Sequence, residues 1–139
     1  MLLRRETRAD VATIDEVHRD AFGRAVEAAL VHALRADAGW VPALSLVAED
    51  ARGRVVGHVV GTRGRVGDVD VVGLGPLGVR PEQQGRGVGQ ALVHAVVAAA
   101  DALDLPLAVL LGAPGYYRRF GFVSSKKPGE RVFFFQRYL

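Results

Sequence analysis

Cysteine is absent from this sequence of 139 residues, and lysine is scarce, occurring only as Lys126 and Lys127. The lack of thiols excludes disulfides, thiolate metal sites and covalent catalysis through cysteine. The four histidines show neither the H-x-x-x-H nor the H-E-x-x-H spacing of a metal site. We therefore expect no metal, and nothing in the composition indicates an oxidising compartment.

Long hydrophobic runs are also missing. No stretch approaches the length of a membrane span, and only three apolar residues precede Arg4, too few for a secretory signal. The sequence therefore predicts a cytoplasmic protein without a membrane partner. Its net charge is +3, but the basic residues, mostly arginine, are scattered. A nucleic-acid site would gather them into a stripe, so we expect no nucleic-acid partner.

Half of the residues are hydrophobic, and this length suits one core, so we expect a single domain over residues 1–139. The spacing of apolar residues predicts strands at 1–5, 43–49, 54–62, 69–79, 105–111, 122–124 and 131–139. Helices are predicted at 7–22, 26–38, 88–103 and, for one or two turns, 114–120. Residues 63–68 are expected to be a connection.

The second predicted helix has apolar residues at helical spacing until Gly39, which is expected just past its C-terminus. Its buried face is predicted to contain Val26, Ala29, Leu30, Ala33 and Leu34.

A glycine-rich turn, with glycine at 85, 87 and 89, leads directly into the helix predicted at 88–103. Small residues let backbone N–H groups approach an anion, and the N-terminus of a helix adds unpaired N–H groups and a positive dipole end. This pattern favours a phosphate or pyrophosphate site. It matches neither the dinucleotide-binding G-x-G-x-x-G nor a Walker A loop. A tight connection without a ligand would have the same spacing.

The strand before this turn contains Gly73, Gly75, Pro76 and Gly78. Proline cannot donate to a sheet ladder, and glycine weakens a strand. We therefore expect this strand to bulge and to part from its neighbour near its end.

Two motifs, in this order, resemble the GNAT superfamily of acetyl-CoA-dependent N-acetyltransferases. Residues 84–89 resemble the family's Q/R-x-x-G-x-G/A signature, and residues 117–122 resemble its Y-x-x-x-G-F. The segment 112–117 resembles a bacterial branch of predicted N-acetyltransferases. The resemblance implies an α/β (α+β) fold with a mixed, mostly antiparallel central sheet, a splayed parallel strand pair and about four flanking helices.

The resemblance also implies acetyl-CoA as co-substrate and gives roles to individual residues. Leu77 would polarise the thioester carbonyl through its N–H, and Tyr117 would protonate the leaving thiolate. Tyr116 is expected to be a packing residue, and solvent exposure is the simpler expectation for Arg118 and Arg119. The implied cofactor-binding residues are Leu77, Gly78, Val79, Gln84, Gly85, Arg86, Gly87, Val88, Gly89 and Tyr117.

The general base is left open. Alignment on the glycine motif puts Gly73 where some family members have a glutamate. A water chain or no dedicated base is an alternative to four side chains, namely Asp70, Glu49, His58 and Glu27. His58 is expected to share a strand face with Val56 and Val60, where a histidine is more often part of a core than a catalyst.

These observations predict direct acetyl transfer to a primary amine in a ternary complex. The amine would belong to a small molecule, a protein N-terminus or a lysine, and the sequence does not choose among them. The alternative is a non-catalytic acyl-CoA-binding sensor or assembly module with the same fold. A homodimer formed through the final aromatic strand is also open.

Overall fold

One sheet organises the chain. The computed structural model describes residues 1–105, 107–111, 123–124 and 132–136, and within them the strand order is β1-β2-β3-β4-β5-β7-β6. The strands are β1 Leu2–Arg5, β2 Trp40–Glu49, β3 Val55–Val66, β4 Val69–Val79, β5 Leu107–Leu111, β6 Val123–Ser124 and β7 Val132–Gln136. Only β4 and β5 run parallel among these neighbours. The predicted mixed, mostly antiparallel sheet is confirmed.

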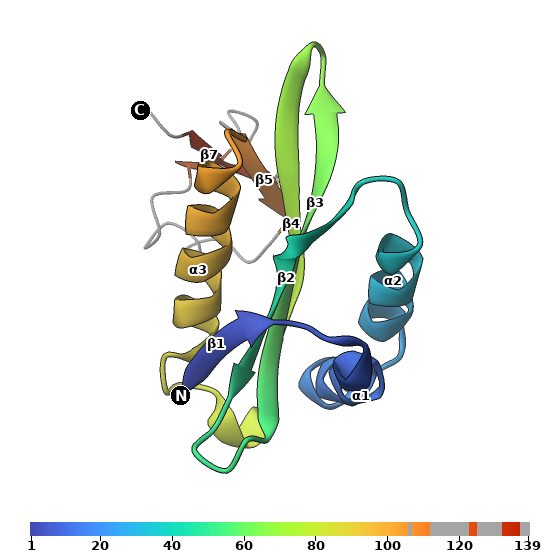
Figure 1. Ribbon diagram of the computed structural model, residues 1–139, viewed down its shortest axis with the longest axis vertical. Helices are drawn as coiled ribbons and strands as arrows, with labels where there is room; N and C mark the ends of the chain where they lie inside the picture. Colours follow the sequence, from blue (N-terminus) through green and yellow to red (C-terminus); the bar gives the residue numbers. More distant parts are fainter. Residues whose placement is uncertain (106, 112–122, 125–131, 137–139) are drawn as a thin grey trace.

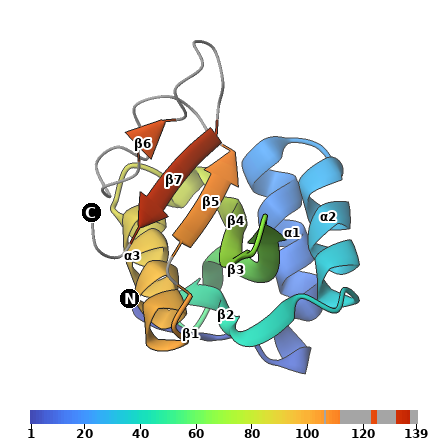
Figure 2. The same cartoon turned by 90° about the horizontal axis from the view of Figure 1, so that it is seen from above.

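Helices cover both faces of the sheet (Figures 1 and 2). On one face lie α1 (Val11–Phe22) and α2 (Val26–Arg35), and on the other lies α3 (Val88–Ala102). Two short 3-10 helices, η1 (Arg8–Asp10) and η2 (Pro81–Gln83), precede α1 and α3. The short helix predicted at 114–120 lies outside the described residues.

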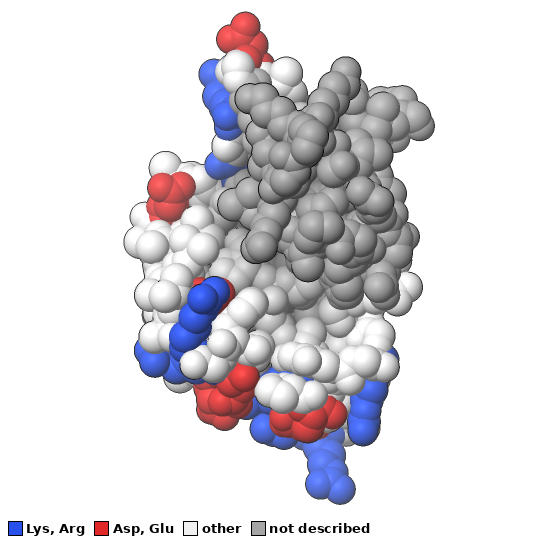
Figure 3. Space-filling view, turned by 180° about the vertical axis from the view of Figure 1, so that it is seen from behind, with Lys and Arg blue, Asp and Glu red and all other residues white. Residues whose placement is uncertain are grey.

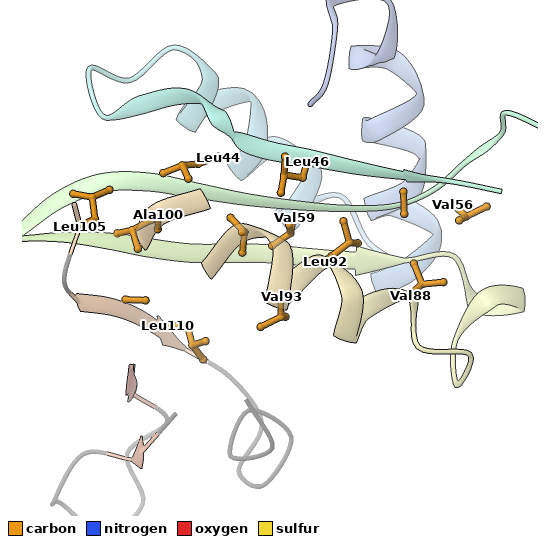
Figure 4. Close-up of a cluster of buried hydrophobic side chains, with 14 residues drawn as sticks. Leu44, Leu46, Val56, Val59, Val88, Leu92, Val93, Ala100, Leu105 and Leu110 are labelled. Atoms are coloured by element: carbon orange, nitrogen blue, oxygen red, sulfur yellow. The ribbon is translucent and has the colours of Figure 1, made fainter. Parts of the chain in front are cut away.

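Two clusters of buried side chains form the core, one on each side of the sheet. The larger cluster packs α3 onto the strands (Figure 4), and it includes the fully buried Leu92 and Val96. Burying each such side chain contributes roughly 1.5–3 kcal/mol. The smaller cluster joins Ile14, Val17 and Val31 of the first two helices to β2 and β3. The apolar side chains of α3 therefore explain its burial against the sheet.

The end of α2 differs from the prediction, because the helix stops at Arg35 and not just before Gly39. Gly39 instead lies against β3, where its carbonyl accepts a hydrogen bond of 2.8 Å from the N–H of Arg63. A Cβ on Gly39 would lie 2.4 Å from the carbonyl oxygen of Arg63. The glycine allows this close approach of two backbones and does not cap the helix.

The buried face of α2 is only partly the predicted one, because Leu34 alone of the five apolar residues packs against the smaller cluster. Ala28 and Val31 are buried, whereas Val26 is 65% exposed and Leu30 is 46% exposed. The small side chain of Ala28 lets the helix pack closely on the layer below, and Arg35 follows on the same side to pair with Glu6 at 3.1 Å. One apolar stripe of α2 therefore faces solvent.

The connection predicted at 63–68 is mostly strand. β3 continues to Val66 and β4 begins at Val69, which leaves a turn of Gly67 and Asp68. Gly67 has a φ of +60°, the left-handed conformation that two-residue hairpins require. β3 and β4 therefore form one long hairpin (Figure 1).

β4 parts from β5 at its C-terminal half, as predicted. Its pairing with β5 begins at Val71 and ends at Leu74. Its pairing with β3 shifts register nearby, since Val59 lies opposite Leu77 but Gly61 lies opposite Leu74. Residues 77–79 of β4 are therefore paired on one side only among the described residues.

Candidate functional site

The glycine loop, residues 80–87, joins the free end of β4 to α3. Gly85 and Gly87 have φ values of +75° and +83°, a conformation that residues with a Cβ rarely adopt. Gly87 is the N-cap of α3, and no side chain caps that end of the helix. The first N–H groups of α3 are therefore open to an anion from solvent.

An open cavity of about 420 Å³ lies beside this loop. Its lining residues are Ala21, Phe22, Leu77, Val79, Gln83, Gln84, Gly85, Gly87, Val88, Gly89 and Gln90. Seven predicted cofactor-binding residues are among them. Gly78 and Arg86 are not, and Tyr117 lies outside the described residues. Sequence reasoning missed Ala21 and Phe22, which belong to the last turn of α1, far from the glycine loop in the sequence.

Backbone groups of β4 face this cavity. The N–H of Arg80 donates to the carbonyl of Val56 on β3 at 2.9 Å, and hydrogen-bonding direction alternates along a strand. The N–H groups of Leu77 and Val79 therefore point away from β3, toward the side where β5 has parted. The side-chain amide of Gln84 donates to the carbonyl of Val79 at 3.0 Å, which ties the loop to the strand.

Arg80 anchors the glycine loop to α1, although nothing in the sequence singled it out. The side chain is 2% exposed. Its Nε donates to the carbonyl of Val55 at 3.0 Å, and its Nη1 donates to Glu16 at 2.9 Å and to Asp20 at 2.7 Å. The position of the loop is thus coupled to the helix that forms the opposite wall of the cavity.

A chain of buried polar side chains lies under β4 on the α1 side. His18 Nε2 lies 2.8 Å from His58 Nδ1, and His58 Nε2 lies 2.8 Å from Ser45 Oγ. Ser45 Oγ in turn donates to the carboxylate of Glu6. Both histidines are fully buried. Sequence reasoning considered His58 alone, since the other members come from distant segments.

The protonation states of these hydrogen-bonded side chains follow from their contacts. Burial, and next the neighbouring His58, lower the pKa of His18 to about 3. Burial also lowers the pKa of His58. Burial alone would raise the pKa of Glu6, but hydrogen bonds with His58, Arg35 and Ser45 outweigh it and bring that pKa to about 2. At neutral pH both imidazoles in this hydrogen-bonded row are therefore neutral, and Glu6 at its far end is a carboxylate.

The other candidate bases lie elsewhere. Asp70 lies near the tip of the β3–β4 hairpin, 3.4 Å from Arg65. Glu49 pairs with Arg4 at 2.6 Å, and Glu27 pairs with Arg24 at 2.6 Å.

None of these carboxylates, and not His58 either, lines the cavity. The expected strand face is also corrected, because Val60 packs on the α1 and α2 side whereas Val56 packs under α3. A register shift between β2 and β3, at Ala48 and Glu49, separates them.

The described residues contain no group of three or more histidine, aspartate or glutamate side chains placed to hold a metal ion. In the same part of the chain, every helix is too short or too polar to cross a membrane.

Comparisons with known proteins agree with this geometry. The sequence profile of the acetyltransferase (GNAT) domain matches residues 41–124. The uncharacterized N-acetyltransferases YhbS and YjhQ of Escherichia coli K12 are 38% and 39% identical to this chain, over 88% and 83% of its length and 73% and 65% of theirs.

Solved structures give the same picture. A GNAT family acetyltransferase from Brucella melitensis, in complex with acetyl-CoA, is 34% identical with a TM-score of 0.86, covering 98% of this chain and 87% of its own. YhbS from Escherichia coli, in complex with CoA, is 32% identical with the same TM-score, covering 97% and 80% of the two chains.

Proposed function

Because this chain belongs to the GNAT acetyltransferase family, we propose that it transfers an acetyl group from acetyl-CoA to a primary amine. The observation that carries the proposal is the cavity between the free end of β4 and the uncapped N-terminus of α3. One wall offers backbone donors for a thioester and an amide arm, and the other offers N–H groups for a pyrophosphate.

The described residues suit coenzyme A. Gly85 and Gly87 keep the loop backbone bare at positive φ, and no atom lies within 4 Å of a Cβ placed on either. The space in front of the loop is therefore open to a ligand. The side chains that line the cavity are apolar or amide, and the ligand's negative charge would meet backbone dipoles.

The reaction follows from these placements. The Leu77 N–H donates to the thioester oxygen as negative charge develops on it, and Val79 holds the pantetheine arm as an added strand. The amine attacks the carbonyl carbon directly, because the chain contains no thiol that could carry the acetyl group. Tyr117 keeps its predicted role as the acid that protonates the leaving thiolate.

The test is release of free coenzyme A thiol from acetyl-CoA in the presence of amines. The panel contains a polyamine, an aminoglycoside, free amino acids and peptides with free N-termini or lysine. The proposal predicts thiol release that depends on one class of amine, with a matching acetylated product by mass spectrometry. Thiol release without an acetylated amine would contradict it.

One observation favours a second function, a non-catalytic acyl-CoA-binding module. The described residues that line the cavity include no aspartate, glutamate or histidine that could serve as a base. Such a module binds acetyl-CoA, measurable by calorimetry, without turnover of any amine.

The surface charge does not favour a nucleic-acid partner. On the described part of the face in Figure 3, basic and acidic side chains lie close to one another at the tip, along one flank and at the lower edge. No continuous basic stripe is visible on the described part of this face, whereas a phosphate backbone would need one.

A further inference from the structure

The directions of the hydrogen bonds in the buried chain can be deduced from its far end. The carboxylate of Glu6 can only accept, so the single hydroxyl hydrogen of Ser45 points to it. His58 Nε2 must then carry the hydrogen that reaches Ser45 Oγ, which leaves His58 Nδ1 unprotonated. His18 Nε2 donates to that nitrogen, and His18 Nδ1 is left as a bare lone pair.

That lone pair has no partner. His18 Nδ1 is the one buried side-chain nitrogen or oxygen without a hydrogen bond among the described residues. An unpaired buried acceptor costs about 1–3 kcal/mol, so this nitrogen would gain from a partner. Every other member of the chain has a partner, so the vacancy lies at one end.

The vacant end lies next to the proposed reaction centre. A Cβ placed on Gly78 would be 2.6 Å from His18 Nδ1, and Gly78 stands between Leu77 and Val79, which line the cavity. The ring of Phe22 stacks on His18 with centroids 6.1 Å apart, and Phe22 also lines the cavity. The backbone of Gly78 therefore lies at the Nδ1 edge of the imidazole, and the ring of Phe22 covers one face of it.

We propose that His18, His58, Ser45 and Glu6 form a proton relay that accepts the proton of the attacking amine, with His18 Nδ1 as its entry. The proposal rests on the acetyl transfer proposed above. Phe22 is the last residue of α1 and is followed by Gly23 at a φ of +65°, a helix end where local opening is easiest. Opening of this helix end moves Phe22 off the imidazole and gives one water molecule a path between the amine and the Nδ1 edge of His18.

Every electron pair and proton of the acetyl transfer has a destination. As the N–C bond forms and the C–S bond breaks, the electron pair leaves on sulfur and the amine nitrogen becomes positive and strongly acidic. Its proton passes to His18 Nδ1, and the Nε2 proton of His18 shifts to His58 Nδ1. The hydrogen bonds beyond carry the positive charge toward Glu6, which stabilises the imidazolium as the carboxylate of a catalytic triad does. The proton returns to solvent after the product leaves.

Other charges around the two rings set the balance of this relay. Glu27 and Asp15 favour protonation of His18, Glu6 and Asp10 favour protonation of His58, and Arg35 opposes both. Burial is the largest influence and keeps both rings neutral at rest, and these carboxylates offset part of its cost when a proton passes through.

The kinetic test compares wild type with His18→Gln, using the amine from the panel that wild type acetylates. His32→Gln is the matched control, because His32 is a half-exposed histidine on α2, 3.0 Å from Asp15 and outside the chain. At neutral pH we expect His18→Gln to lower kcat by about 10²–10⁴-fold, the usual contribution of general-base catalysis. The affinity for coenzyme A should not change, and the control should match wild type.

The pH profile separates a relay from a structural role. With a relay, the deficit of His18→Gln shrinks as pH rises, because hydroxide then removes the proton. A deficit that is constant with pH, or no deficit, would overturn the relay while acetyl transfer by wild type stands. A wild type that turns over no amine would overturn both proposals.

A second measurement uses the wild-type protein alone, so it does not depend on whether a variant folds. Proton–nitrogen correlation spectra of the wild-type imidazoles at neutral pH should show both His18 and His58 protonated on Nε2 and bare on Nδ1. A proton on His18 Nδ1, or an imidazolium at that pH, would overturn the proposed entry point.

Discussion

The glycine loop and the histidine relay lie on two sides of the same strand and are built from different groups. The loop uses backbone N–H groups, glycines at positive φ and a helix end, all within residues 77–90. The relay uses side chains from four segments, with His18 and His58 40 residues apart. One is open to solvent, and the other is buried.

This difference decides how each region responds to change. A backbone site withstands substitution of most side chains but not a change in backbone conformation. A buried side-chain network withstands no loss of a member, since the partner left behind is unsatisfied. Each prediction below probes one region against the other.

The largest effect concerns pH and the buried histidines. The pKa of His18 is lowered in the folded chain, from 6.5 to about 3. The stability that depends on its neutral form is complete above pH 6.5 and is lost as pH falls toward 3. The loss amounts to roughly 5 kcal/mol from this group alone. Urea unfolding at several pH values measures it.

The upper part of that window isolates the histidines, because Glu6 contributes only between about pH 4.5 and 2. His18→Gln should flatten the dependence there, and His32→Gln should leave it unchanged. An equally steep loss in His18→Gln would show that the buried ring is not the cause.

The next effect concerns the donor on β4. Leu77→Pro removes one N–H that points away from β3, so the sheet ladder keeps its hydrogen bonds. We expect kcat to fall by about 10²–10³-fold, the loss typical of one oxyanion donor. Leu77→Ala keeps the N–H and is the control. If the two variants lose kcat equally, the side chain and not the backbone carries the role.

A smaller effect concerns Arg80, which connects the two regions. Arg80→Met keeps most of the buried volume but leaves the carbonyl of Val55 without its side-chain donor and frees Glu16 and Asp20. We expect a loss of about 2 kcal/mol in the free energy of unfolding, and weaker binding of coenzyme A because the loop is no longer held to α1. Unchanged affinity would mean that the loop holds its shape without this anchor.

The smallest effect compares two glycines of equal strain. Gly87→Ala and Gly53→Ala both place a Cβ at positive φ, +83° and +77°, in open space. Each should cost about 1 kcal/mol of stability. Only the first should weaken coenzyme A binding, by about tenfold, since Gly53 lies in the β2–β3 turn. Calorimetry with coenzyme A measures this, and equal affinities would remove Gly87 from the site.

The predictable parts of the molecule were those whose cause is local. A glycine loop, an apolar helix and the hairpin of β2 and β3 each depend on neighbouring residues, and the structure has all three. Gly39 shows the limit of prediction from local sequence. A glycine is needed there because the carbonyl of Arg63 lies close to it, and Arg63 is distant in the sequence. The exposed stripe of α2 was also not predictable from local sequence, since the small Ala28 is buried against the rest of the fold and the bulkier Leu30 is exposed.

In the candidate site, too, residues with local neighbours were easier to predict than residues with distant partners. Leu77 and Gly87 are close together in the sequence, and both line the cavity as one local segment. Sequence reasoning missed Arg80 and His18, whose partners lie far away in the chain. Tyr117 remains a prediction, as it lies outside the described residues.

Because Gly78 has no side chain, only the backbone of β4 lies between His18 and the other side of the sheet at this position. A residue with a side chain here would press on His18 from a strand that also shapes the coenzyme side. This position therefore cannot gain a side chain without moving His18, and we expect residue 78 to vary less among relatives than the exposed stripe of α2.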